Sequence, residues 1–110
     1  MKACVRSLAQ DDIIRQYRYY LVQEDSPVTA ERFLKQVRIA INQLRKAPRI
    51  GQTKLLKNPK LSGLRSWPVN GFRLIRIYYV VRDCGLLVIR VLHSKRDVNM
   101  MLEDDLIEEL

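Results

Sequence analysis

The chain contains one histidine, His93, in the basic stretch RVLHSKRD at positions 90–97. This setting raises the question of RNA cleavage, in which 2′-hydroxyl attack needs a base, an acid for the leaving oxygen and positive charge around the phosphate. Asp97 could orient the imidazole of His93, but neither a tyrosine nor a second histidine follows that could protonate the leaving oxygen. Because the set is incomplete, we expect His93 to close a strand end through hydrogen bonds rather than to act as a base.

Other reactive constellations are absent from the sequence. The two cysteines, Cys4 and Cys84, have no paired histidines at metal-ligand spacing, and there is no phosphate-binding glycine loop or Ser-His-Asp signature. We therefore expect no catalytic residue, no metal and no cofactor. We place Cys4 in a buried strand and Cys84 in a turn, with both thiols reduced, as is usual in the cytosol. The sequence shows neither a signal peptide nor an apolar run that could span a membrane.

Positive charge dominates the chain and is distributed unevenly. The 110 residues include 20 Lys and Arg against 12 Asp and Glu, for a formal net charge of +8. Five of the acids fall in the last eight residues, so all 20 basic residues share the first 102 positions with only seven acids. This field favours an acidic or polyanionic partner and speeds the encounter with one. The competing interpretation is that the basic residues only keep a small protein in solution.

The apolar pattern predicts a single α+β domain over residues 1–110. Ser26 as N-cap and Pro27 as first helical residue start the clearest helix, with an apolar stripe of Ala30, Phe33, Leu34, Val37, Ile41 and Leu44. A first helix precedes it, and a short C-terminal helix carries Val98, Met101, Leu102 and Leu106 on one side. Period-two alternation predicts strands at 2–6, 64–69, 72–81 and 86–92. We expect the helical hairpin to cover one face of a small antiparallel sheet, with the first strand at its edge.

Two groups of residues are candidates for partner binding. On the second helix, Lys35, Arg38 and Arg45 form a basic ridge, and the helical hairpin has Ile39 and Val22 as spare apolar residues beside it. On the sheet, a three-residue loop at 83–85 would pair Arg82 with Leu86, and the resulting face would carry Arg76, Tyr78 and Arg90.

The predicted sheet has two different faces. Tyr78 lies opposite Arg90 and Arg76 opposite Leu92, so these arginines are expected on an open face where they could pair with carboxylate or phosphate. Arg65 adds positive charge to the sheet. A solvated face with arginine stems over apolar neighbours is the alternative, and a one-residue slip would swap the faces. The face expected to meet the helices carries Ile75, Ile77, Tyr79, Ile89 and Val91.

The second half of the chain resembles a known family. The segments GLRSWPVNGF at 63–72, IRIYYV at 75–80 and GLLVIRVLHSKRD at 85–97 are similar to the ParE branch of the ParE/RelE toxin superfamily. The resemblance implies the toxin of a bacterial type II toxin–antitoxin pair. Such a toxin inhibits DNA gyrase by protein binding and is neutralised by a ParD-like antitoxin. A homodimer and a hetero-oligomer with the antitoxin both stay open.

RelE-like relatives instead cut messenger RNA on the ribosome, and this alternative stays open too. Arg73 and Arg96 occupy positions that resemble two arginines of those nucleases, and His93 would join them. The lysine pair expected before the LRS segment is missing, with Lys60 the nearest candidate. Acids rather than a tyrosine follow Arg96, so the nuclease set is incomplete and a toxin that binds protein is favoured.

Overall fold

The computed structural model of the chain describes residues 1–83 and 85–105. In this part of the chain, five strands form one sheet in the order β1-β5-β4-β3-β2. Their bounds are Ala3–Val5 for β1, Gln52–Thr53 for β2, Arg65–Val69 for β3, Phe72–Arg82 for β4 and Gly85–His93 for β5. β1 pairs with β5 in parallel, whereas β2 to β5 are antiparallel neighbours. The α+β architecture and the edge position of β1 are therefore as the sequence predicts, whereas the parallel pairing of β1 differs from the antiparallel sheet expected.

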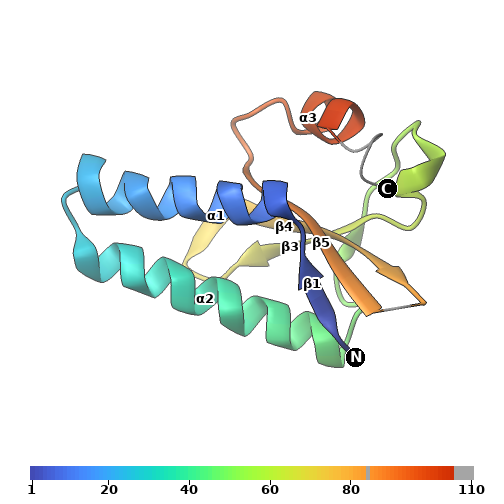
Figure 1. Ribbon diagram of the computed structural model, residues 1–110, viewed down its shortest axis with the longest axis horizontal. Coiled ribbons are helices and arrows are strands. Elements are labelled where there is room, and N and C mark those ends of the chain that lie inside the picture. The colour runs from blue at the N-terminus through green and yellow to red at the C-terminus, as the bar shows by residue number, and fades with distance from the viewer. Residues whose placement is uncertain (84, 106–110) are drawn as a thin grey trace.

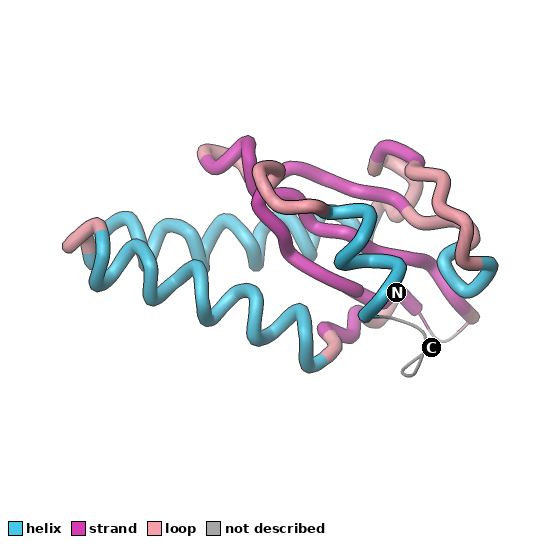
Figure 2. The backbone as a smooth tube through the Cα atoms, turned by 90° about the horizontal axis from the view of Figure 1, so that it is seen from above, coloured by secondary structure: helices cyan, strands magenta, loops and turns pink. Residues whose placement is uncertain are grey.

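Two long helices form an antiparallel hairpin (Figure 1). α1 spans Ser7–Arg18 and continues as a π-helical turn over Tyr19–Gln23, α2 spans Pro27–Lys46, and α3 spans Val98–Asp105. The predicted start of α2 is confirmed, because the Ser26 side chain accepts the Thr29 N–H at 3.2 Å and Pro27 is the first helical residue. The turn between α1 and α2 projects beyond the sheet (Figure 2). None of the helices described is long and apolar enough to cross a membrane.

The hairpin of β4 and β5 contains a bulge that the sequence does not reveal. Tyr78 pairs with Arg90 as predicted, but Arg82 pairs with Gly85 rather than with Leu86. The register shifts between Tyr78 and Tyr79, so one extra residue of β5, Ile89, is accommodated there. The prediction of the loop at 83–85 is thus wrong, and Cys84 itself lies outside the described residues.

Both faces of the sheet are covered. α1 and α2 pack on one face around Phe33, Val37, Leu44, Ile75, Ile77, Tyr79 and Val91. The second face, which the sequence predicts to be open, carries its own core of Leu61, Leu64, Tyr78, Val80, Ile89, Leu92 and Leu102. Ile89 belongs to this second core and not to the helix face, because the bulge turns its side chain over. The C-terminal helix supplies Leu102, whereas the predicted contribution of Leu106 lies outside the described residues.

A short segment and α3 form the lid of this second core. Residues Pro59–Leu61 make one turn of 3-10 helix, with Asn58 accepting the Lys60 N–H at 3.0 Å. The Glu103 carboxylate on α3 accepts the Lys57 N–H at 2.8 Å, which joins the two segments. The sheet residues Tyr78, Val80, Ile89 and Leu92 are consequently interior residues rather than part of a binding face.

Candidate partner-binding surface

Arg90 is buried, although the sequence predicts it on an open face. Only 3% of Arg90 is exposed, and its Nε and Nη2 donate to the two carboxylate oxygens of Asp12 at 2.7 and 2.9 Å. Asp12 also accepts the Val91 N–H at 3.0 Å, and Gln16 donates to the Val91 carbonyl at 2.9 Å. β1 ends opposite Val88. Beyond that point, side chains of α1 take the place of a neighbouring strand at the edge of β5.

Arg65 fixes the turn between α2 and β2. Its Nη1 donates to the carbonyls of Arg49 and Gly51 at 3.2 and 2.8 Å. The Tyr79 hydroxyl reaches the same turn, where it donates to the Pro48 carbonyl at 2.7 Å and accepts the Gly51 N–H at 3.0 Å. Burial raises the pKa of Tyr79, while this bond from Gly51 and the charge of Arg65 act in the opposite direction. The guanidinium of Arg65 is thus committed to backbone acceptors inside the protein.

Arg76 links β4 to the neighbouring strands, and Tyr78 is buried. Arg76 Nε donates to Ser66 Oγ at 3.0 Å, and its Nη2 donates to Gln52 Oε1 at 3.4 Å. Only 4% of Tyr78 is exposed. Burial raises the pKa of Tyr78, and the positive charge of Arg76 partly opposes that rise. The predicted open face of Arg76, Tyr78 and Arg90 is therefore wrong as a surface, and partner contacts by the half-buried Arg65 and Arg76 stay a prediction.

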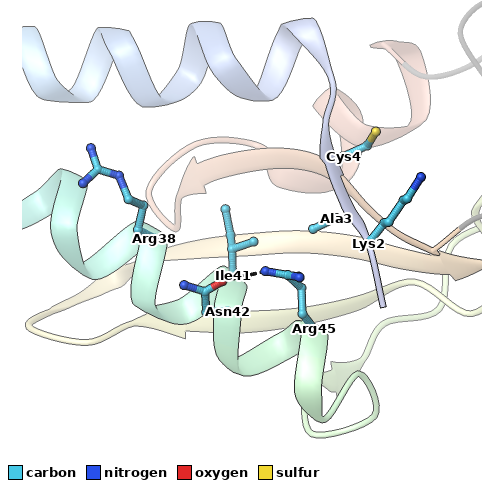
Figure 3. A pocket seen from close by; sticks show the side chains of 7 residues that line it. All are labelled: Lys2, Ala3, Cys4, Arg38, Ile41, Asn42 and Arg45. Carbon is cyan, nitrogen blue, oxygen red and sulfur yellow. Dashed lines mark hydrogen bonds between the residues drawn. The ribbon is translucent and has the colours of Figure 1, made fainter.

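The basic ridge of α2 is exposed along its whole length, as Lys35, Arg38 and Arg45 all lie in solvent. Two of these residues help to form a hollow of about 510 Å³ between α2 and β1 (Figure 3). The α2 wall is formed by Arg38, Ile41, Asn42 and Arg45, and the β1 wall by Lys2, Ala3 and Cys4. The exposed side chain of Cys4 contradicts the prediction that it is buried. The sequence ridge is thus one side of a concave surface that local patterns alone did not indicate.

The apolar residues predicted beside the ridge are accessible. Val22 is 68% exposed and Ile39 is 39% exposed. Ile39 faces away from β1 and lines a second hollow of about 360 Å³ with Trp67 and Arg73, among others. α2 therefore borders a hollow on each side, one with Arg38 and Arg45 and the other with Ile39 and Trp67.

His93 closes the end of β5 as the sequence predicts. Its Nδ1 accepts the backbone N–H of Lys95 at 3.2 Å, and its carbonyl accepts the N–H of Arg96 at 3.1 Å. Asp97, the predicted orienting group for the imidazole, accepts the Met100 N–H at 3.1 Å instead. Asp97 thus acts as a cap for α3.

The residues of the nuclease alternative lie in different places. His93 and Arg96 line a hollow of about 440 Å³ together with Arg15, Gln16, Tyr19, Tyr20 and Lys95. Arg73 lines the hollow beside Ile39. In the part of the chain that the structure describes, the three residues do not line one shared pocket. The same described residues contain no group of three His, Cys, Asp or Glu side chains that could hold a metal ion.

Sequence reasoning did not identify Asp12 and Gln16 as partners of β5. The signal was present, because Asp12 and Gln16 follow the buried Ala9 at helical spacing. An acid on the inner side of a helix requires a cation or donor facing it. Only the fold identifies that partner as Arg90.

A family profile and a solved structure each match most of the chain. A family profile described as "ParE toxin of type II toxin-antitoxin system, parDE" matches residues 5–98. Among solved structures, the chain resembles the "Chromosomal ParDE TA system from P. aeruginosa" with a TM-score of 0.58 and 19% sequence identity. That match covers 84% of this chain and 95% of the other, which supports the fold alone. No curated protein sequence matches the chain. On the strength of the profile match, the chain belongs to the ParE toxin family of type II toxin–antitoxin systems.

Proposed function

We propose that the chain is a toxin that inhibits DNA gyrase by binding it, and that a ParD-like antitoxin neutralises it. Family membership over residues 5–98 carries this proposal. The similar solved structure, titled as a ParDE toxin–antitoxin system, supports an antitoxin as partner. Gyrase acts in the cytosol, where this proposal places the protein.

The surface of α2 supports binding of an acidic partner. Lys35, Arg38 and Arg45 are exposed, and none of the described residues around the hollow beside β1 is acidic. Val22 and Ile39 offer exposed apolar area on the same helical hairpin. An antitoxin segment that orders on binding needs both apolar contact and charge complementarity to offset the lost entropy.

The environment of His93 supports a function without catalysis. Its Nδ1 is engaged by the Lys95 N–H, and Asp97 is engaged at the start of α3. A general base that deprotonates a 2′-hydroxyl needs an orienting group and a matching acid on the other side of the phosphate. Among the described residues that line this hollow there is no carboxylate that could orient His93.

Expression in bacteria tests the proposal against its alternatives. Induction of the chain alone should cause filamentation and a DNA-damage response, and co-expression of the antitoxin should restore growth. Purified toxin should inhibit supercoiling by gyrase in the absence of ribosomes. Rapid arrest of translation with cleavage of ribosome-bound mRNA would instead support the RelE-type nuclease. Unhindered growth would indicate an inactive remnant and contradict the proposal.

A further inference from the structure

Only some of the backbone N–H and carbonyl groups of β1 pair with β5. Leu86 N donates to the Lys2 carbonyl at 2.9 Å and Arg6 N donates to the Val88 carbonyl at 3.2 Å, so even-numbered residues direct their polar groups toward β5. In a parallel ladder the residues between them point the other way. The N–H and carbonyl groups of Ala3 and Val5 therefore face the free edge of the sheet.

Side chains already occupy the two ends of that free edge. Arg45 Nε donates to the Met1 carbonyl at 2.9 Å, and Gln10 Nε2 donates to the Val5 carbonyl at 2.8 Å. Between these two capped carbonyls lie the N–H and carbonyl of Ala3 and the N–H of Val5. These three groups form a short row with the donors and the acceptor that one added strand requires.

The hollow beside β1 gives this edge a chemical preference. Ala3 and Ile41 lie at its centre, with Arg38 and Arg45 around them on the α2 side (Figure 3). Lys2 follows the opposite parity along β1 and projects away from the two arginines (Figure 3). A strand laid along β1 therefore meets positive charge on both of its faces, with a small apolar patch at Ala3 and Ile41.

We propose that an acidic, extended segment of the antitoxin adds to the sheet as a strand along β1. The inference rests on the proposed toxin function and names the site and mode of antitoxin binding. Backbone bonds to Ala3 and Val5 set the register, while acidic side chains pair with Arg38, Arg45 and Lys2. A second copy of this chain is a poorer occupant, because it would bring its own Lys2, Arg38 and Arg45 against the same cations.

Hydrogen exchange measured by NMR tests the backbone pairing directly. The probe is a full-length ParD-like antitoxin that restores growth when it is co-expressed with the toxin, added to the labelled toxin until the complex is saturated. Exchange at Ala3 and Val5 should slow by at least about tenfold, because their amides gain hydrogen bonds. The amide of Cys4 serves as the internal control, since it already faces β5, and its exchange should change much less. Unchanged exchange at Ala3 and Val5 in a saturated complex would overturn the inference.

A proline substitution tests the same contact by affinity. Ala3→Pro removes the outward N–H, and proline is tolerated on an edge strand where that N–H faces away from the sheet. It should weaken antitoxin binding by about fivefold or more, the effect of one net hydrogen bond, whereas Ala3→Ser should stay within about twofold. Thermal unfolding of both variants reports whether the fold persists. If Ala3→Pro does not fold, the exchange measurement on the unmodified chain still decides.

The remaining outcomes separate this inference from the function on which it rests. If a folded Ala3→Pro variant binds the antitoxin with unchanged affinity, the strand addition is wrong, while the toxin–antitoxin proposal still holds. No binding of the antitoxin to the unmodified chain would contradict both. Concentration-dependent protection of Ala3 and Val5 in the toxin alone, with a dimer in sedimentation, would identify a second copy as the occupant and overturn the acidic segment.

Discussion

The arginines of α2 and those of the sheet are the same residue type in opposite environments. Arg38 is exposed on α2 and makes no ion pair among the described residues, whereas Arg65, Arg76 and Arg90 direct their guanidinium groups at acceptors inside the protein. Arg45 stands between the two groups, since it is exposed but bonded to Met1 and Asn42. The net charge of the chain therefore overstates the positive charge that is available to a partner. Part of it organises the fold.

The largest effect is expected when the partner of Arg90 is removed, which tests whether this arginine stabilises the fold. Asp12→Ala leaves a buried guanidinium without its carboxylate and the Val91 N–H without an acceptor. We expect the free energy of unfolding to fall by about 3–5 kcal/mol, because breaking a buried pair exposes the cost of burying one charge. Urea unfolding measures the loss, with the exposed neighbour Asp11 changed to Ala as the matched control. Equal losses in the two variants would show that Arg90 is not held by Asp12.

Charge reversal tests the other side of the comparison. The double variant Arg38→Glu with Arg45→Glu should slow association with the antitoxin by about tenfold at low salt, with a smaller change in dissociation. It should also flatten the salt dependence of the association rate, which stopped-flow mixing measures between about 50 and 500 mM salt. If the association rate of the unmodified toxin does not change with salt over this range, the basic ridge serves solubility alone.

A pH titration of stability tests the environment of Tyr78, which lies beside the sheet arginine Arg76. Burial raises the pKa of Tyr78 above its ordinary value of 10.0, against the opposing charge of Arg76. Because the folded state holds this phenol neutral, its contribution to stability is complete below pH 10 and is lost as the pH rises through the raised pKa. The loss amounts to at most about 1.4 kcal/mol per pH unit.

Denaturant unfolding of the unmodified chain and of Tyr78→Phe at pH 8 to 11 measures this contribution. The phenylalanine variant lacks the titrating group, so its free energy of unfolding should fall less steeply above pH 10. Parallel curves for the two proteins would show that Tyr78 titrates as it does in the unfolded chain.

The smallest effect is expected at the end of β5. His93→Ala removes the acceptor of the Lys95 N–H, and we expect a loss of about 1 kcal/mol or less from the free energy of unfolding. Toxicity should be largely retained, because the proposed function needs no base at this position. Growth assays and antitoxin binding are measured together. A folded variant that binds antitoxin but no longer arrests growth would contradict the function without catalysis.

Local features explain what the sequence could predict. The N-cap at Ser26, the apolar stripe of α2 and the strand at β4 depend on residues close together in the chain, and all three are confirmed. The bulge at Ile89 depends on how two strands twist together, which the alternation does not encode. The sequence pattern therefore gives the correct pairing of Tyr78 and the wrong face for Ile89.

The candidate site was less predictable than the fold because its contacts are distant in sequence. Exposure of Lys35, Arg38 and Arg45 follows from the helical pattern. The hollow that Arg38 and Arg45 share with Ala3 requires the N-terminal strand to lie beside the end of α2. The burial of Arg90 requires an acid 78 positions away. The periodicity of helices and strands does not predict either of these contacts between distant parts of the sequence.

The pairing of β1 with β5 has a consequence for the order of folding during synthesis. β1 is made first but its partner strand is the last of the sheet, and Asp12 cannot meet Arg90 until 78 further residues exist. Contacts between such distant residues form late, since a long loop must close before they contribute. Until β5 leaves the ribosome, the free edge of β1 and the end of the hollow beside it have no sheet to support them. A nascent chain would then reach the proposed antitoxin-binding form only after β5 has been made.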